Sequence, residues 1–183
     1  MKNKNLVIAF SIIGLVVSVL SIIWSIVLLG AEAMLLNLGY IINVLLCFHA
    51  SVLCVIYLVC YARGKSFPIG PTIVFGLFAI GQGLSTTGDV NGIIVFATYL
   101  LVAILAIFRK INRVALIAGS AIVLAVRLYV YINSISLIYT MTSQNAMFLY
   151  GTLDVISIIS LFTFVSILIF AIGNEVISPV KKK

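Results

Sequence analysis

The sequence predicts an all-α protein, a polytopic membrane helix bundle of about six transmembrane helices. The bundle forms a single integral membrane domain over residues 1–183, with both termini in the cytoplasm (N-in/C-in). Three observations predict this class. Hydrophobic residues make up 64% of the chain, charged residues only 8%, and the mean hydropathy is +1.35. The apolar residues gather in runs long enough to cross a bilayer, and the basic residues cluster between alternate runs. This composition excludes a soluble globular domain.

Each apolar run is close to the roughly 20 residues that a helix needs to cross about 30 Å of hydrocarbon. The third and fourth runs are the shortest. Together they are too long for one helix, and turn-forming residues between Ser85 and Gly92 separate them, which favours a hairpin of two spans. The predicted helices cover residues 6–29, 33–61, 69–86, 90–108, 114–139 and 147–172.

The basic residues give the orientation, because cytoplasmic loops retain Lys and Arg while translocated loops lack them. All of the 11 basic residues except Arg127 precede the first span or follow the second, fourth or sixth. The other connections carry Glu32, Asp89 and the polar segment 140–145, without Lys or Arg. We therefore expect both termini in the cytoplasm and the protein in the cell membrane, with the lipid bilayer as its surroundings. The residues of the basic clusters are Lys2, Lys4, Arg63, Lys65, Arg109, Lys110, Arg113, Lys181, Lys182 and Lys183.

The N-terminal segment has a second interpretation. Lys2 and Lys4, an apolar run and Ala31-Glu32-Ala33 resemble a secretory signal with its cleavage site. The apolar run is longer than the 7–15 residues of a signal sequence. We therefore expect a retained first helix, whereas cleavage would leave five spans.

Arg127 lies inside the fifth span, where an ionised side chain is costly unless it meets a partner or water. At about 1.5 Å per residue, Arg127 and Asp154 of the sixth span both lie roughly 10 Å from the outer face. The short connection makes these helices antiparallel neighbours, so the sequence predicts an Arg127–Asp154 ion pair. The pair could clamp two helices together or bind a substrate, and the sequence leaves both open.

Other polar side chains gather near the same depth on four spans. An outward-opening cavity lined by amides, aromatic rings and one ion pair would suit a small polar or aromatic ligand. The alternative is an ordinary interfacial belt of tyrosines, with amides that hydrogen-bond between helices. The candidate ligand-binding residues are Arg127, Asp154, Tyr131, Tyr150, Asn37, Tyr40, Asn43 and Gln82.

The first span carries small residues at alternating steps of three and four, which places them on one helix face. Such a face permits close backbone approach and marks a helix-packing surface in membranes. It could serve packing within the chain or docking of another membrane subunit. The residues of this face are Ser11, Gly14, Ser18, Ser21 and Ser25.

This arrangement resembles the substrate-binding S components of energy-coupling-factor vitamin importers. The length, the six spans, the cytoplasmic ends and the outward polar cluster carry the resemblance, together with Gly14-x-x-x-Ser18 and Ser21-x-x-x-Ser25. In that family, small residues on the first helix contact the transmembrane coupling subunit, and here serine replaces the alanine of that motif. The resemblance implies capture of a small molecule and a partner subunit at the first helix.

We expect no catalytic residue, no bound metal and no cofactor. His49 is the only histidine and shares no helix face with Cys47 or Cys54, so no catalytic dyad or metal pair is predicted. The spacing of these cysteines and Cys60 along one helix excludes disulfides within it. Basic residues in short clusters, without aromatic interleaving, indicate topology and no nucleic-acid partner.

Three functional hypotheses follow from the sequence. The first is a substrate-binding subunit of a small-molecule importer, and the second is a non-enzymatic membrane interaction protein, such as an immunity, defence or regulatory factor. The third is an intramembrane enzyme, which no motif supports. The usage of Ile, Lys and Asn is typical of a bacterium with an AT-rich genome.

Overall fold

A computed structural model of the chain describes residues 3–35, 38–65, 69–85, 90–108, 113–140 and 144–173. Side chains at positions 25, 28–35, 40, 85, 134–140 and 144–154 lie outside this description. The described residues form helices and no strand, which confirms the all-α prediction for them. The helices are α1 (Lys4–Leu35), α2 (Leu38–Ala62), α3 (Gly70–Ser85), α4 (Val90–Ile107), α5 (Arg113–Thr140) and α6 (Gln144–Gly173).

Membrane-length apolar segments occur in five of these helices. The remaining helix, α3, contributes a shorter apolar segment, Gly70–Leu84. The described residues therefore form a helical protein with segments long and apolar enough to cross a membrane. The long segments are Lys4–Trp24, Ile41–Ala62, Val90–Ile107, Arg113–Asn133 and Val155–Gly173.

The boundary between the first two helices differs from the prediction. We expected the first span to end at residue 29 and the second to begin at 33, but α1 continues to Leu35 and α2 begins at Leu38. The cause is helix propensity, because Ala31, Glu32 and Ala33 are strong helix formers. The fall in hydropathy marks where a helix leaves hydrocarbon, and the helix itself continues beyond that point.

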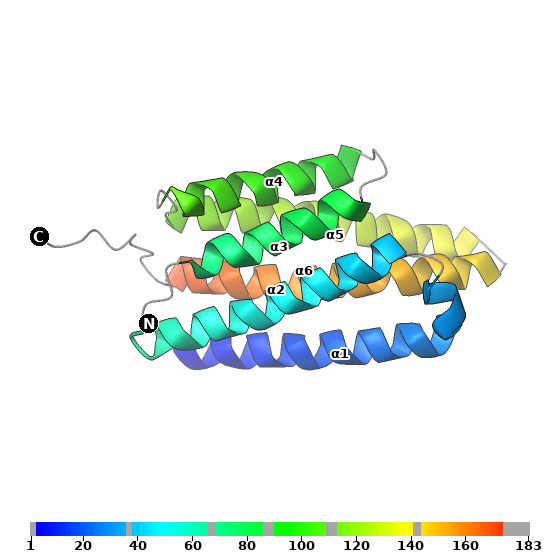
Figure 1. Ribbon diagram of the computed structural model, residues 1–183, viewed down its shortest axis with the longest axis horizontal. Helices are drawn as coiled ribbons and strands as arrows, with labels where there is room; N and C mark the ends of the chain where they lie inside the picture. Colours follow the sequence, from blue (N-terminus) through cyan, green and yellow to red (C-terminus); the bar gives the residue numbers. More distant parts are fainter. Residues whose placement is uncertain are drawn as a thin grey trace, which may run out of the picture.

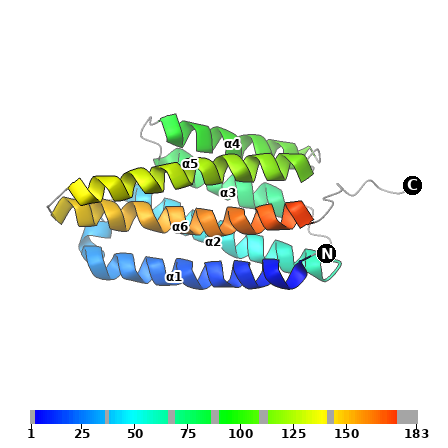
Figure 2. The ribbon, with the colours of Figure 1, turned by 180° about the vertical axis from the view of Figure 1, so that it is seen from behind.

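Neighbouring helices pack in chain order and close into a ring. Consecutive helices contact each other from α1 to α6, α1 also packs on α6, and α2 contacts α6 across the bundle. Figure 1 shows α4 at one edge and α1 at the other, and from behind α5 and α6 lie in front of α3 and α2 (Figure 2). Side chains connect α3 to α5 and α6, through Arg127 with Gln82 and through Phe78 with Phe164.

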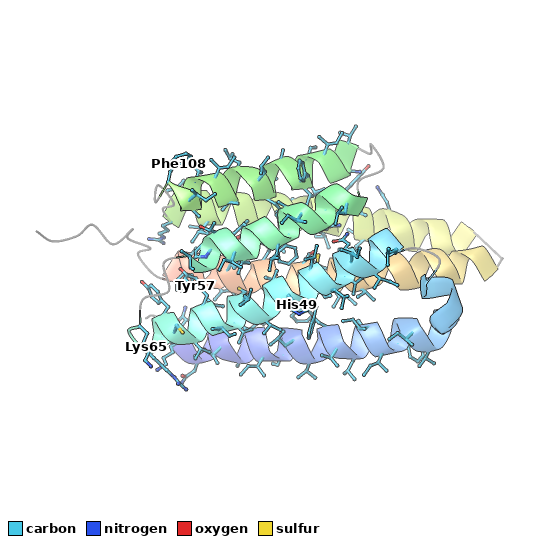
Figure 3. The ribbon with its side chains drawn as sticks, viewed as in Figure 1. His49, Tyr57, Lys65 and Phe108 are labelled. Atoms are coloured by element: carbon cyan, nitrogen blue, oxygen red, sulfur yellow. The ribbon has the colours of Figure 1, made fainter. Side chains whose placement is uncertain are left out.

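One end of the bundle gathers the described basic residues, apart from Arg127. Lys4 begins α1, Arg63 and Lys65 follow α2, and Arg113 begins α5. Figure 3 places Lys65 and Phe108 at this end, where the figure also shows the start of α1. The Arg113 guanidinium donates to the carbonyl of Ile172 at 2.6 Å, which joins the start of α5 to the end of α6.

Gly64 ends α2 at the same end of the bundle. Its φ of 70° is the left-handed conformation that favours glycine after a helix. The amide of Lys65 donates to the carbonyl of Cys60 at 2.9 Å, and the amide of Gly64 donates to that of Tyr61 at 3.1 Å. These two bonds form a Schellman motif, which directs the chain away from α2 toward the connection before α3.

The surface and the interior have the polarity expected for a protein in lipid. Exposed positions on α1, α4 and α5 carry large apolar side chains such as Leu20, Leu101 and Ile132. Buried positions include many serines, which allow helices to approach closely. Small polar residues therefore lie inside the bundle together with apolar side chains, and the outward positions carry bulky apolar residues.

A group of aromatic rings fills the centre between α3, α4 and α6. Phe78, Tyr99 and Phe164 are fully buried, and their ring centroids lie 5.0 to 5.3 Å apart. Phe75 extends the group, at 5.4 Å from Phe164. These rings position Tyr99, whose hydroxyl belongs to the site described next.

Candidate functional site

Arg127 meets Gln82 inside the bundle. The Nη2 atom of Arg127, on α5, donates a hydrogen bond of 2.6 Å to Oε1 of Gln82, on α3. Gln82 is buried and Arg127 is partly buried. Because the backbones of α3 and α5 are not in direct contact over their described residues, this side-chain bond joins them across the interior.

Asn43 and Cys47 of α2 border the same region. The Cys47 thiol donates to Oδ1 of Asn43 at 3.2 Å, both residues are buried, and Cys47 interacts electrostatically with Arg127. Oδ1 of Asn43 also lies where α3 passes closely, since a Cβ added at Gly81 would come within 2.5 Å of it. Glycine at position 81 therefore lets α3 reach α2 and places Gln82 in the interior.

Tyr99 of α4 and Ser160 of α6 complete the arrangement. Both are fully buried, and the Tyr99 hydroxyl lies near Arg127 and Ser160. The Tyr99 hydroxyl interacts with the side chains of Arg127 and Ser160, but these two hydroxyls and Nε of Arg127 make no hydrogen bond of good geometry. Such orphaned buried polar atoms are rare in folded proteins and call for an explanation. The polar cluster is defined here as Asn43, Cys47, Gln82, Tyr99, Arg127 and Ser160.

The structure brings together three of the predicted ligand-binding residues, Arg127, Gln82 and Asn43, in this cluster. Tyr131, one turn further along α5, is partly buried. Asn37 and the side chains of Tyr40, Tyr150 and Asp154 lie outside the described residues, and so does the predicted ion pair.

The backbone register of α5 and α6 bears on that ion pair. Arg113 contacts the carbonyl of Ile172, and counting equal numbers of residues from this contact puts Arg127 opposite Ile158. Asp154 is therefore about one turn farther along α6 than Arg127.

The small-residue face of α1 packs inside the chain. A Cβ added at Gly14 would lie 2.6 Å from Cβ of Phe162, so α1 and α6 are in close contact there. Ser11 and Ser18 are buried, Ser21 is partly buried, and the Ser25 side chain is outside the description. The face that resembles a coupling-subunit contact is thus occupied by α6.

Hydroxyl groups along this packing surface bond to their own helices. Each donates to the carbonyl four residues earlier, at 2.6 to 2.8 Å. We call this surface the serine seam, and it consists of Ser11, Gly14 and Ser18 of α1 with Phe162, Thr163 and Ser166 of α6. A cavity of about 10 Å³ adjoins it, lined also by Ser51, Cys54 and Val55 of α2. That volume admits at most one water molecule.

His49 lies apart from the polar cluster. Its side chain is exposed on α2, and Nδ1 is 2.7 Å from the carbonyl oxygen of Leu45 (Figure 3). Cys47, Cys54 and Cys60 are free thiols. Among the residues that the structure describes, no group of histidine, cysteine or acidic side chains could hold a metal ion.

Tyr99 and Ser160 are the members that the sequence analysis missed. The position of Tyr99 could have indicated a special role. It lies nine residues into a span, whereas tyrosines in membrane proteins concentrate at the interfaces. Ser160 carried no comparable signal, because α6 contains two other serines.

In comparisons with known proteins, no family model matches the chain, and no curated protein or solved structure matches it.

Proposed function

We propose that this chain is a six-span membrane protein with both termini in the cytoplasm, and that it is the substrate-binding subunit of a small-molecule importer. The polar cluster is its binding site. The observation that carries the proposal is the Arg127 guanidinium, which donates to Gln82 inside an apolar bundle, beside the buried hydroxyls of Tyr99 and Ser160.

The orientation rests on the basic end of the bundle. Lys4, Arg63, Lys65 and Arg113 share that end, and cytoplasmic ends retain basic residues. The six-span count depends on α3, which has 16 residues and is short for a span. Its support is that α3 runs beside α4 and returns the chain to the opposite end (Figure 1).

Access to the site is supported from the outer end. Gln82 lies three residues before the end of α3, which is about 5 Å. Asn43 likewise lies near the start of α2. A ligand arriving at this end would pass one helical turn before meeting the cluster, in agreement with an outward-facing pocket.

A partner subunit at α1 also belongs to this proposal. Because the serine seam is filled by α6, the partner would contact the opposite side of α1, where large apolar residues such as Ile12, Val16 and Leu20 are exposed.

Native mass spectrometry of the detergent-purified protein tests the proposal. We expect wild type and Ser120→Ala to carry a bound small molecule, and Arg127→Gln to lose it while keeping its thermal unfolding midpoint within a few degrees. Ser120 is a suitable control because it is on the same helix, fully buried and also without a partner. No bound molecule in wild type, or the same molecule in folded Arg127→Gln, would contradict the proposal.

The second candidate, a non-enzymatic interaction protein, is supported by His49. Ionisable residues in membrane helices normally face a bundle interior or a water-filled cavity, yet this imidazole is exposed. A protein partner covering α2 would explain it. The discriminating result is a protein that co-purifies with wild type and is lost in His49→Leu, without a bound small molecule.

A further inference from the structure

The basic end of the bundle carries an excess of positive charge. Lys4, Arg63, Lys65 and Arg113 lie there, and all four residues are exposed. The whole sequence has 11 Lys and Arg against four Asp and Glu, so the excess also holds for the complete chain. A surface with charge of one sign attracts partners of the opposite sign.

The acidic residues of the chain are too few and too distant to balance these four cations. Glu32 is in the last turn of the 32-residue α1, at the opposite end of the helix from its start. Asp154 lies in the first half of α6, about 28 Å before the end of that helix. Asp89 precedes α4 in the sequence, and the 18 residues of α4 rise by about 27 Å from there. Glu175 alone follows α6 in the sequence, and one carboxylate cannot balance four cations.

The basic residues lie where apolar segments of membrane length begin or end. Lys4–Trp24 and Arg113–Asn133 each begin with a basic residue, and Ile41–Ala62 ends one residue before Arg63. Long basic side chains at the end of a membrane helix extend their charged groups toward the headgroups, while their stems stay on apolar surface. The charges of the basic end are therefore at the depth of the lipid phosphates.

Local structure positions these side chains for phosphate binding. Arg113 uses Nη2 to donate to the carbonyl of Ile172, and a guanidinium has further N–H groups that can donate to phosphate oxygens. Arg63 and Lys65 flank Gly64, whose φ of 70° turns the chain at the end of α2. Two cations are thus held next to one tight turn, and a third is fixed to the end of α6.

We propose that the basic end of the bundle binds the headgroups of anionic phospholipids in the adjoining leaflet, in preference to zwitterionic headgroups. The inference is independent of the importer function, because it needs only that the helices cross a membrane, which the membrane-length segments support. Each Lys or Arg near an anionic membrane surface strengthens the attraction about fivefold. The same residues would then serve orientation and lipid selectivity.

Tryptophan fluorescence, quenched by phospholipids with brominated acyl chains, reports which lipids contact a chosen end of the bundle. Trp24 is the only tryptophan of the chain and is 59% exposed. It lies about 30 Å along α1 from Lys4, so it reports on the opposite end. Phe108 is 69% exposed at the basic end (Figure 3), and Phe108→Trp combined with Trp24→Phe moves the reporter there. The quenchers compared in vesicles are brominated phosphatidylglycerol and brominated phosphatidylcholine.

With the reporter at position 108, we expect phosphatidylglycerol to bind at least about threefold more tightly than phosphatidylcholine. With the reporter at Trp24, we expect equal binding of the two lipids. Combining Lys4→Gln, Arg63→Gln and Lys65→Gln should remove the preference at the basic end, whereas Lys4→Arg, Arg63→Lys and Lys65→Arg together should keep it. Salt at about 1 M, where the Debye length is about 3 Å, should weaken the preference of the unsubstituted basic end.

Equal quenching by the two lipids at position 108 would overturn the proposal and leave orientation as the role of the basic residues. A preference that is equally strong at Trp24, or that survives the three glutamine substitutions, would also overturn it, because the selectivity would then arise elsewhere. If the glutamine variant does not fold, the salt series decides. A preference unchanged at about 1 M salt would contradict binding by charge.

Discussion

The serine seam and the polar cluster both bury polar groups in the same bundle, yet they treat hydrogen bonding differently. In the seam, Ser11, Ser18, Thr163 and Ser166 each bond to a carbonyl of their own helix. In the cluster, the hydroxyls of Tyr99 and Ser160 and Nε of Arg127 have no such bond. A surface whose hydroxyls all bond within their own helices needs no ligand to complete its hydrogen bonds, and it serves helix packing. In the cluster such hydroxyls lie beside the Arg127 guanidinium, and this combination is why the proposed site lies there.

The largest expected effect on stability comes from placing a larger side chain in the serine seam. Gly14→Leu should prevent α1 from docking on α6, because even a Cβ at this position would lie 2.6 Å from Cβ of Phe162. Gly14→Ala should cost about 1–3 kcal/mol of unfolding free energy, as overpacking usually does. Size-exclusion chromatography and thermal unfolding in detergent measure both variants.

Gly76 supplies the control for this prediction. A Cβ there would meet nothing within 4 Å, so Gly76→Ala should leave stability unchanged or raise it by about 0.5–1 kcal/mol. If Gly14→Ala were as stable as Gly76→Ala, the seam would not be closely packed, and α1 would be free to dock elsewhere.

A smaller loss of stability than that of Gly14→Leu is expected when the hydrogen bond between Arg127 and Gln82 is removed. Gln82→Leu removes the acceptor of the 2.6 Å bond from Arg127, and hydrogen bonds to charged groups contribute about 1.5–3 kcal/mol. A double-mutant cycle with Arg127→Met isolates the pair and should give a coupling near 1 kcal/mol, as expected between membrane helices. A coupling of zero would mean that Arg127 and Gln82 act independently.

The seam and the cluster also differ in how far the sequence predicted them. Regular spacing placed Ser11, Gly14 and Ser18 on one helix face, because an α-helix has a fixed period. Which surface that face would meet depended on tertiary packing, and the structure shows α6. The cost of a buried charge identified Arg127 as an informative residue.

The partners of Arg127 were harder to predict. Gln82 and Arg127 are 45 residues apart in sequence, and their contact requires the closed ring of helices. Matching of depths along the two spans predicted Asp154 as a partner, and the side chain of Asp154 lies outside the described residues. Gln82 was predicted as a polar residue at the right level, and its bond to Arg127 was not.

Within the seam, removing one satisfied hydroxyl should have a modest effect. Ser18→Ala deletes the 2.6 Å bond to the carbonyl of Gly14, and an ordinary hydrogen bond contributes about 0.5–1.5 kcal/mol. The unfolding midpoint should fall by a few degrees, with ligand retention unchanged. Loss of the bound molecule in folded Ser18→Ala would place the ligand at the seam and contradict the division of roles.

Tyr99→Phe should have the smallest effect on stability and the sharpest effect on binding. The hydroxyl is buried and makes no hydrogen bond of good geometry, so its removal relieves a desolvation cost, while the ring keeps its packing against Phe78 and Phe164. The unfolding free energy should stay within about 0.5 kcal/mol of wild type or rise, and the molecule seen by native mass spectrometry should be lost. A loss of stability above about 1 kcal/mol would show that the hydroxyl has a structural partner. In that case the cluster, like the seam, would be satisfied from within, and the contrast that locates the site would disappear.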